Sequence, residues 1–212
     1  MECKAVTDKP SSLPRIYLNR HGETAWSLSG QHTGRTDIPL TERGEEDSRK
    51  LSERLLPVKF SRVLTSPLQR ARRTCELAGF GEVAEIEPDL TEWDYGDYEG
   101  QLSFDTRKER PEWNLFRDGG LHGELPAQVS ERADRLIARM RTHEGNIAVF
   151  SHGQFLRALT ARWIGLPVGH AQHFILNTAS ISILGYEHNL EDGPAILLWN
   201  ASGEGLHRGE SE

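Results

Sequence analysis

The sequence has few cysteines, and their positions limit the chemistry that thiols could perform. Only Cys3 and Cys75 occur among its 212 residues. We expect the first in an N-terminal tail and the second in a helix, so we predict no disulfide between them. The pair also lacks the spacing of metal-binding cysteines. Such low cysteine usage is typical of the cytoplasm, where we expect the protein to act.

Long apolar runs are missing as well. No stretch approaches the roughly 20 apolar residues of a membrane-spanning helix, and the segment MECKAVTDKPSSLPR lacks the apolar core of a signal peptide. Positive charges are also fewer than negative ones. The sequence has 25 Lys and Arg and 32 Asp and Glu, which gives a net charge of −7. We therefore expect neither a membrane nor a nucleic acid as partner. An anionic substrate would need a cationic pocket that acts against the field of the whole protein.

The apolar segments that are present alternate with helical patterns. Strands are predicted over residues 15–20, 62–65, 83–86, 146–150, 180–186 and 195–199. Helical patterns begin at Thr41, Pro67, Pro126 and Gln154. The segment 89–125 is Gly-rich, aromatic and irregular. This order predicts an α/β fold, a three-layer α/β/α sandwich whose mostly parallel central sheet has an antiparallel edge made by the last two strands. We expect a single domain over 15–200, between flexible tails at 1–14 and 201–212.

Two of the predicted strands end in a histidine that is followed by glycine. Arg20-His21-Gly22 follows the first strand, and Ser151-His152-Gly153 follows the fourth. Ligands of an open α/β sheet bind at the carboxyl ends of its strands, so the two histidines can meet in one pocket. An isolated His-Gly pair is more often structural than catalytic. Arginine, however, holds phosphate through paired hydrogen bonds, and a neutral histidine beside it can attack phosphorus.

The sequence around these histidines favours the catalytic interpretation. Four blocks stand out: RHGETAWSLSGQHTGRTDIPLTERG at 20–44, SPLQRARRT at 66–74, EWDYGDYEG at 92–100 and SHG at 151–153. Together they resemble the histidine phosphatase superfamily, in the branch that includes the cofactor-dependent phosphoglycerate mutases. The resemblance covers about residues 15–187, keeps the order of the family's motifs and implies a phosphoglycerate mutase-like fold.

The resemblance implies a role for five residues. His21 matches the nucleophile that becomes phosphorylated, and His152 matches the second histidine that stabilises the phosphoryl group. Arg20 and Arg70 match the arginines that hold the phosphate. Glu92 matches the acid that protonates the leaving oxygen, which an alkoxide leaving group needs. It implies no cofactor and no metal.

Alternatives exist for two of these assignments. Arg70 lies in a segment with Arg72 and Arg73, which would suit a solvated basic face, but the SPLxRA pattern singles it out. Glu92 has neighbours that could supply a carboxyl group instead: Asp94, Asp97 and Glu99.

Substrate-binding residues are predicted from the same motifs. They are Ser27, which stands where many relatives have asparagine, and His32, Thr33, Tyr95 and Gly153. A bisphosphate substrate would need a second anion site, for which the candidates are Arg35, Lys108, Arg110 and Arg117. Three further histidines, His122, His170 and His173, are expected at the surface or in structural roles.

The details of the motifs favour hydrolysis. The WS form of the first block, together with EWDYGDYEG, resembles a sub-branch of small acid phosphatases and a fungal sedoheptulose-bisphosphatase. A mutase must exclude water while its intermediate reorients, and the chain is short where mutases carry an insertion. We therefore predict a phosphatase that acts on a small phosphorylated metabolite, with an optimum at mildly acidic pH.

Phosphoglycerate mutase is the alternative activity. A phosphohistidine phosphatase in signalling is less favoured because it would need a shallow, open site. The sequence leaves the oligomeric state open, although an edge strand or an exposed Trp163 region could pair.

Overall fold

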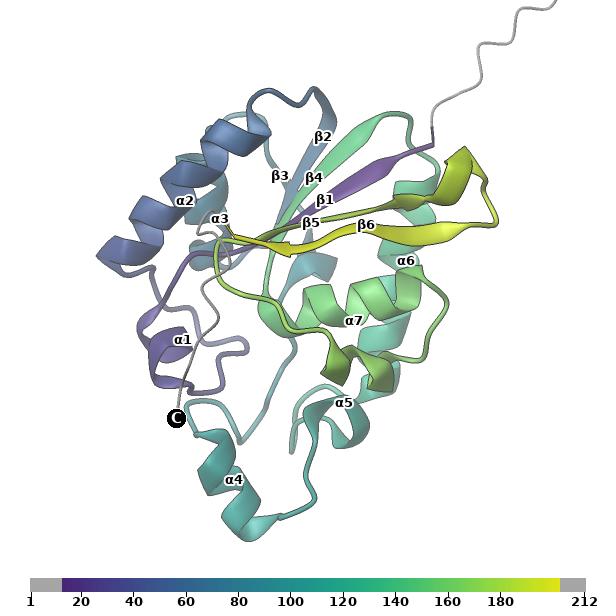
Figure 1. Ribbon diagram of the computed structural model, residues 1–212. Coiled ribbons are helices and arrows are strands. Elements are labelled where there is room, and N and C mark those ends of the chain that lie inside the picture. Colours follow the sequence, from purple (N-terminus) through teal and green to yellow (C-terminus); the bar gives the residue numbers. More distant parts are fainter. Residues whose placement is uncertain (1–12, 203–212) are drawn as a thin grey trace, which may run out of the picture.

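The structure is a computed structural model that describes residues 13–202 (Figure 1). The expected flexible tails lie almost wholly outside these residues, as does Cys3. Within them, one sheet of six strands has the order β3-β2-β4-β1-β5-β6. Its strands are β1 (Arg15–Arg20), β2 (Phe60–Thr65), β3 (Glu85–Ile86), β4 (Asn146–Ser151), β5 (Ile181–Tyr186) and β6 (Pro194–Ala201).

The directions of the strands confirm the predicted sheet. Strand β1 runs parallel to β4, and β2 runs parallel to both β3 and β4. Strand β5 is antiparallel to β1 and to β6, so the last two strands form the antiparallel edge. β1 lies between β4 and β5 and is hydrogen-bonded on both sides.

Helices cover both faces of the sheet and make the outer two layers (Figure 1). One face carries α2 (Glu42–Leu55) and α3 (Gln69–Leu77), and the other carries α6 (Pro126–Arg141) and α7 (Gly153–Trp163). The side chains of β4 alternate between the layers: Ile147 and Val149 pack with α6 and α7, while Ala148 and Phe150 pack with α2 and α3. Because both faces are buried, the strand is apolar throughout its centre rather than alternating.

Local signals explain where the main helices begin. The Thr41 hydroxyl accepts a hydrogen bond of 3.0 Å from the Gly44 N–H, and Glu42 and Glu45 lie in the first turn of α2, where carboxylates favour the helix dipole. α6 begins at Pro126, a position at which proline loses no helical hydrogen bond.

Several expectations about shorter elements were wrong. α3 begins at Gln69 rather than at Pro67, because its N-cap is Leu68. The segment 89–125, expected to be irregular, includes two short helices, and a further short helix follows the first strand. These and the 3-10 turns are α1 (Ala25–Ser29), α4 (Ser103–Glu109), α5 (Leu115–Asp118), η1 (Pro88–Leu90), η2 (Val168–His173) and η3 (Glu187–Asn189).

Trp163 also lies elsewhere than the sequence suggested. Its side chain is fully buried, and the indole N–H donates to the Gly185 carbonyl at 3.1 Å. The ring fills the space between α7 and the sheet, so it offers no surface for pairing.

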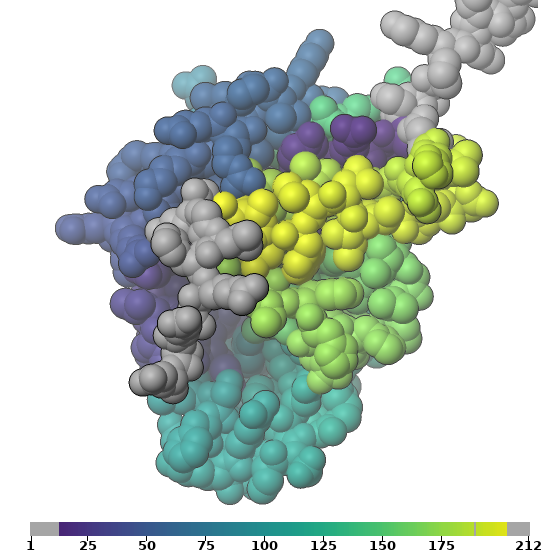
Figure 2. Space-filling model, in the orientation of Figure 1, coloured from purple at the N-terminus to yellow at the C-terminus, as the bar shows by residue number. Residues whose placement is uncertain are grey.

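The surface shows where the short elements lie. In the space-filling view the teal segment that carries α4 forms a lobe at one end of the molecule, and β6 crosses the face that is shown (Figure 2). Leu197 and Leu198 of β6 are 44% and 37% exposed. Among residues 13–202, no helix combines the length and apolar character that crossing a membrane requires.

Candidate active site

The register of two parallel strands brings the histidines together. Arg20, the last residue of β1, is paired with Ser151, the last residue of β4. The His21 N–H donates to the Ser151 carbonyl at 3.0 Å. The rings of His21 and His152 therefore lie side by side at the carboxyl edge of the sheet, with centroids 5.2 Å apart.

Hydrogen bonding assigns the tautomer of His21. Its Nδ1 lies 2.7 Å from the Gly22 carbonyl oxygen, and a carbonyl can only accept, so Nδ1 carries the proton and Nε2 keeps a free lone pair. Burial, with the Arg70 and Arg20 guanidinium groups, holds the pKa of His21 well below its ordinary value of 6.5. The ring is therefore neutral, which is the state that a nucleophile requires.

His152 is held in the complementary tautomer by Ser66. The Ser66 hydroxyl oxygen accepts the Leu68 N–H at 3.3 Å and lies 2.7 Å from His152 Nε2. The hydroxyl can thus donate its proton to Nε2, which leaves Nδ1 protonated. Burial and the Arg70 cation lower the pKa of His152 well below 6.5, so this ring is a neutral donor.

Two arginines complete the centre of the site. Arg70 is fully buried, and its two terminal nitrogens donate to the Thr36 carbonyl at 3.0 Å and the Gly34 carbonyl at 2.8 Å. Arg20 donates through Nη1 to the Leu176 carbonyl. Both groups are anchored by neutral carbonyls, so their charge remains available to an anion.

Three buried donors at this point have no hydrogen-bond partner within the described part of the chain: Arg20 Nε, Arg70 Nε and His152 Nδ1. Roughly 90% or more of buried polar groups in proteins are paired, so three exceptions beside one neutral histidine are unusual. All three are donors, and two are cationic, which is the donor set of an anion site.

Glu92 lies at the N-terminus of α7, against the same cavity. Its Oε1 accepts the N–H groups of Trp93 and Phe155 at 2.8 Å each, and its Oε2 accepts the Gln154 N–H at 3.0 Å. The neighbouring carboxylates are engaged elsewhere and do not line the cavity. They are Asp94 with Arg35, Asp97 with His122, and Glu99 with the backbone of Arg35 and Thr36.

The two glycines that follow the histidines relieve different close contacts. A Cβ on Gly153 would lie 3.2 Å from the Arg20 guanidinium carbon, so this glycine leaves room for the arginine. A Cβ on Gly22 would lie 2.3 Å from the Gly44 carbonyl, and the Gly22 N–H donates to the Thr74 hydroxyl. Gly22 therefore packs against the start of α2.

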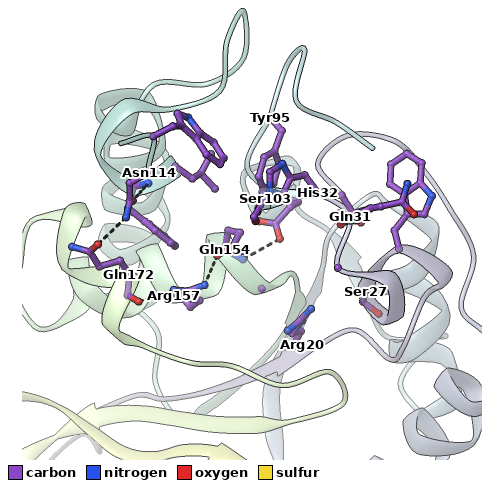
Figure 3. Close-up of a pocket in the computed structure, with 18 of the residues that line it drawn as sticks. Arg20, Ser27, Gln31, His32, Tyr95, Ser103, Asn114, Gln154, Arg157 and Gln172 are labelled. Atoms are coloured by element: carbon purple, nitrogen blue, oxygen red, sulfur yellow. Dashed lines mark hydrogen bonds between the residues drawn. The ribbon is translucent and has the colours of Figure 1, made fainter. Parts of the chain in front are cut away.

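The site opens into a cavity of about 530 Å³. His32 and Tyr95 stack at 4.7 Å between centroids and form one wall, with Arg157 and Arg20 below them (Figure 3). Ser27 and Thr33 also line the cavity. The Ser27 hydroxyl accepts the Thr24 N–H and donates to the Thr24 carbonyl, so it also caps α1.

The second-anion candidates named from the sequence do not line the cavity. Arg35, Lys108 and Arg117 are paired with Asp94, Asp105 and Asp118, and Arg110 donates to the Tyr98 hydroxyl. The cations that do line it, besides Arg20, are Arg107 and Arg157.

Arg157 is the main cavity residue that the sequence did not reveal. It donates to the Gln154 side chain at 2.6 Å and to the carbonyls of Ala171 and Gln172, and its guanidinium lies 4.5 Å from the Phe116 ring centroid. All these partners are neutral. Its only signal in the sequence is its place five residues after His152, on the cavity side of α7.

Residues 13–202 contain no group of three His, Cys, Asp or Glu side chains arranged to hold a metal. The chemistry available to the described residues is that of a buried, neutral nucleophile within a cationic donor set, with a carboxyl group beside it.

A cationic, histidine-containing cavity at the carboxyl edge of an α/β sheet suits the binding of a phosphate ester. The sequence model of the histidine phosphatase superfamily (branch 1) matches residues 16–202, and the chain belongs to this superfamily. It is a phosphoric monoester hydrolase that acts on small phosphomonoesters.

Relatives and solved structures agree with this assignment. An acid phosphatase of Mycobacterium tuberculosis is 40% identical, with 83% of this chain and 88% of the relative covered. Sedoheptulose 1,7-bisphosphatase of Saccharomyces cerevisiae is 34% identical, with 89% and 93% covered. A solved structure of an open-reading-frame product from M. tuberculosis superposes with a TM-score of 0.83 at 36% identity, covering 90% of this chain and 98% of that one.

Proposed function

We propose that the chain hydrolyses phosphomonoesters through a phosphohistidine formed on His21. The three unpartnered buried donors beside His21 carry this proposal, because they match the oxygens of a phosphoryl group. In the first step His21 Nε2 forms a bond to phosphorus while the ester P–O bond breaks, and Glu92 gives its proton to the leaving oxygen. In the second step Glu92 takes a proton from water, and the water oxygen forms a bond to phosphorus while the P–Nε2 bond breaks, which releases inorganic phosphate and restores neutral His21.

The test is covalent labelling by a phosphate ester labelled with ³²P. We expect acid-labile label on the wild-type chain and none on His21→Ala, with turnover lost. His122→Ala is the control, because this histidine is exposed and pairs with Asp97 outside the cavity. Label that survives the His21 substitution would overturn the assignment.

The cavity favours a substrate with a second anionic group. Arg107 lines the cavity, is exposed and has no ion-pair or hydrogen-bond partner within residues 13–202, and Arg157 is bonded only to neutral groups. One relative is a sugar bisphosphatase by name. We infer that a sugar bisphosphate is the better substrate class than a simple monophosphate.

Arg107→Gln tests this preference without disturbing the core. Since a charge-assisted hydrogen bond contributes about 1.5–3 kcal/mol, we expect KM for sedoheptulose 1,7-bisphosphate to rise by ~10-fold while KM for an aryl phosphate changes little. Lys108→Gln, on the same helix but ion-paired to Asp105, should change neither. Equal changes for both substrates would contradict the second anion site.

Two other activities are less well supported. A phosphoglycerate mutase would retain its phosphorylated intermediate, whereas this cavity has no long covering insertion within the described residues. A phosphohistidine protein phosphatase would need a shallow site, and the cavity is walled by His32, Tyr95 and Trp113. We propose that the chain is a small-molecule phosphatase that acts in the cytoplasm, with neither nucleic acid nor membrane as partner.

A further inference from the structure

A buried ion pair is hydrogen-bonded to the backbone on both sides of Glu92. Arg132 of α6 and Glu124, in the loop before that helix, are joined by two parallel hydrogen bonds of 3.1 and 2.8 Å. Their side chains are only 8% and 13% exposed. We call this pair the Arg132–Glu124 clamp. Neither residue lines the cavity, so the pair does not contact the substrate.

The arginine of the clamp holds the chain just before Glu92. Arg132 Nη1 donates to the Thr91 carbonyl and to the Asp89 carbonyl, the latter at 2.8 Å. With its two bonds to the carboxylate, the guanidinium makes four hydrogen bonds. The peptide that leads into Glu92 is therefore fixed from the α6 side.

The carboxylate of the clamp holds the chain just after Glu92. Glu124 Oε2 accepts the Asp94 N–H at 3.0 Å, and the Glu124 backbone carbonyl accepts the Trp93 indole N–H at 2.9 Å. The acid thus lies between two backbone segments that are bonded to the same ion pair.

Arg132 also contacts Phe155, a residue whose backbone binds the Glu92 carboxyl group. The Arg132 guanidinium carbon lies 4.3 Å from the centroid of the Phe155 ring, within the range of a cation–π contact. The N–H of that same Phe155 donates to Glu92 Oε1 at 2.8 Å. One guanidinium therefore orders both the chain that carries the acid and a donor that holds its oxygen.

We propose that Arg132 and Glu124 are positioning residues that set the orientation of the Glu92 carboxyl group toward the leaving oxygen. The proposal rests on the role of Glu92 as proton donor given above. Stability alone does not account for the pair, because the cost of desolvating two charges offsets their attraction and apolar side chains of similar size often serve as well. Its directed hydrogen bonds instead fix geometry, and small displacements of catalytic groups are costly.

The double variant Arg132→Met with Glu124→Gln removes the clamp without leaving an unpaired buried charge. The readout is the ratio of kcat/KM for 4-nitrophenyl phosphate, whose leaving group needs no proton, to that for glycerol phosphate, whose leaving group does. Because general acid catalysis contributes typically 10²–10⁴-fold, we expect Glu92→Gln to raise this ratio by about 100-fold or more, and the double variant to raise it by ~10-fold. A merely structural pair would slow both esters alike.

Arg135→Met is the matched control. Arg135 lies on the same helix, its side chain is 59% exposed and it pairs with the Asp89 carboxylate at 3.0 Å, so the ratio should stay at the wild-type value. In a Glu92→Gln background, removal of the clamp should add less than about a 2-fold change, because effects that act through one residue are not additive.

The outcomes separate this inference from the proposed function. An unchanged ratio in the double variant, alongside a raised ratio in Glu92→Gln, overturns the positioning role and leaves the proton donor in place. An unchanged ratio in Glu92→Gln overturns the proton donor itself, and the positioning role with it. If the double variant does not fold, Arg132→Lys keeps a cation opposite Glu124 but has one nitrogen with three donors, so it cannot make all four hydrogen bonds, and the same ratio decides the question.

Discussion

The histidines of this site are distinguished by where their protons lie. His21 donates through Nδ1 to the Gly22 carbonyl and keeps Nε2 bare, while Ser66 leaves His152 with a proton on Nδ1. One ring can therefore attack phosphorus and the other can donate to a phosphoryl oxygen. Two identical side chains differ in function because different neutral partners set their tautomers.

The lowered pKa of His21 predicts how kcat/KM depends on pH in acid. Attack needs the neutral ring, and in the folded protein burial and two arginines hold the pKa well below 6.5. As the pH falls through 6.5, His21 therefore stays neutral and kcat/KM is not lost there. We expect the acid limb of the kcat/KM profile for an aryl phosphate to lie well below the ordinary histidine pKa of about 6.5. In Arg20→Gln, which removes a neighbouring cation, the limb should move to higher pH, and a wild-type limb at 6.5 would contradict this account.

A second prediction at the residue scale concerns the leaving group. Glu92→Gln keeps the size of the side chain and a carbonyl oxygen for N–H donors, but has no proton to give. We expect kcat for alkyl phosphates to fall by about 100-fold or more and kcat for aryl phosphates to fall far less. Steady-state rates on both ester types check this, and equal losses would remove Glu92 from the acid role.

The catalytic residues predicted from the sequence all lie in short motifs, and three of them lie at strand ends. His21, Arg20 and His152 follow apolar runs, and parallel strands bring such positions together. Arg157 and the Arg132–Glu124 clamp were missed for a physical reason. Their roles depend on partners distant in the sequence, such as Phe116 and Thr91, and only the folded packing brings those partners near.

At the scale of elements, the loop after β1 packs backbone to backbone on the start of α2. A Cβ on Gly44 would lie 2.1 Å from the Glu23 carbonyl, and a Cβ on Gly22 would lie 2.3 Å from the Gly44 carbonyl. No flexible side chain separates the two segments. The position of His21 is thus tied to the first turn of α2.

Gly44→Ala should disturb that contact. Because overpacking a close contact costs typically 1–3 kcal/mol, we expect the free energy of unfolding to fall by about that amount, and kcat to fall as the loop carrying His21 is displaced. Urea unfolding and steady-state kinetics measure the two effects. Gly165→Ala is the comparison, since Gly165 has a φ of +78° and a Cβ there would meet nothing within 4 Å. It should lose about 1–2 kcal/mol of stability through its backbone alone and keep full activity.

The helices and strands with the clearest apolar patterns were the ones predicted best from the sequence. The central strands and α6 carry continuous or periodic apolar residues, so their pattern settled both type and place. α4 has seven residues and α5 has four, so both are too short to show an apolar period. Their helical turns are fixed by tertiary contacts, which a local pattern does not record.

At the scale of the whole molecule, a protein of net charge −7 concentrates cations in one cavity. Arg20, Arg70 and His152 each keep a buried donor without a partner in the described residues, and such groups are costly to desolvate. Binding of an anion that pairs with these donors should therefore favour the folded state.

Thermal melting should show this directly. Orthovanadate or inorganic phosphate at about 100 times its Kd should stabilise the protein by roughly 2.7 kcal/mol, while chloride at equal ionic strength should not. The stabilisation should disappear in Arg20→Ala. An equal rise of Tm with chloride, or a rise that persists in the variant, would mean that the anion acts elsewhere.

The place of β1 in the sheet has a consequence for synthesis on the ribosome. Strand β1 is hydrogen-bonded on one side by β4 and on the other by β5, whose residues are translated more than a hundred positions later. The nascent chain therefore carries His21 without its neighbour His152 until β4 and the residue after it have been made. On the proposed mechanism, the chain cannot hydrolyse phosphate esters before His152 has been made and β4 has paired with β1.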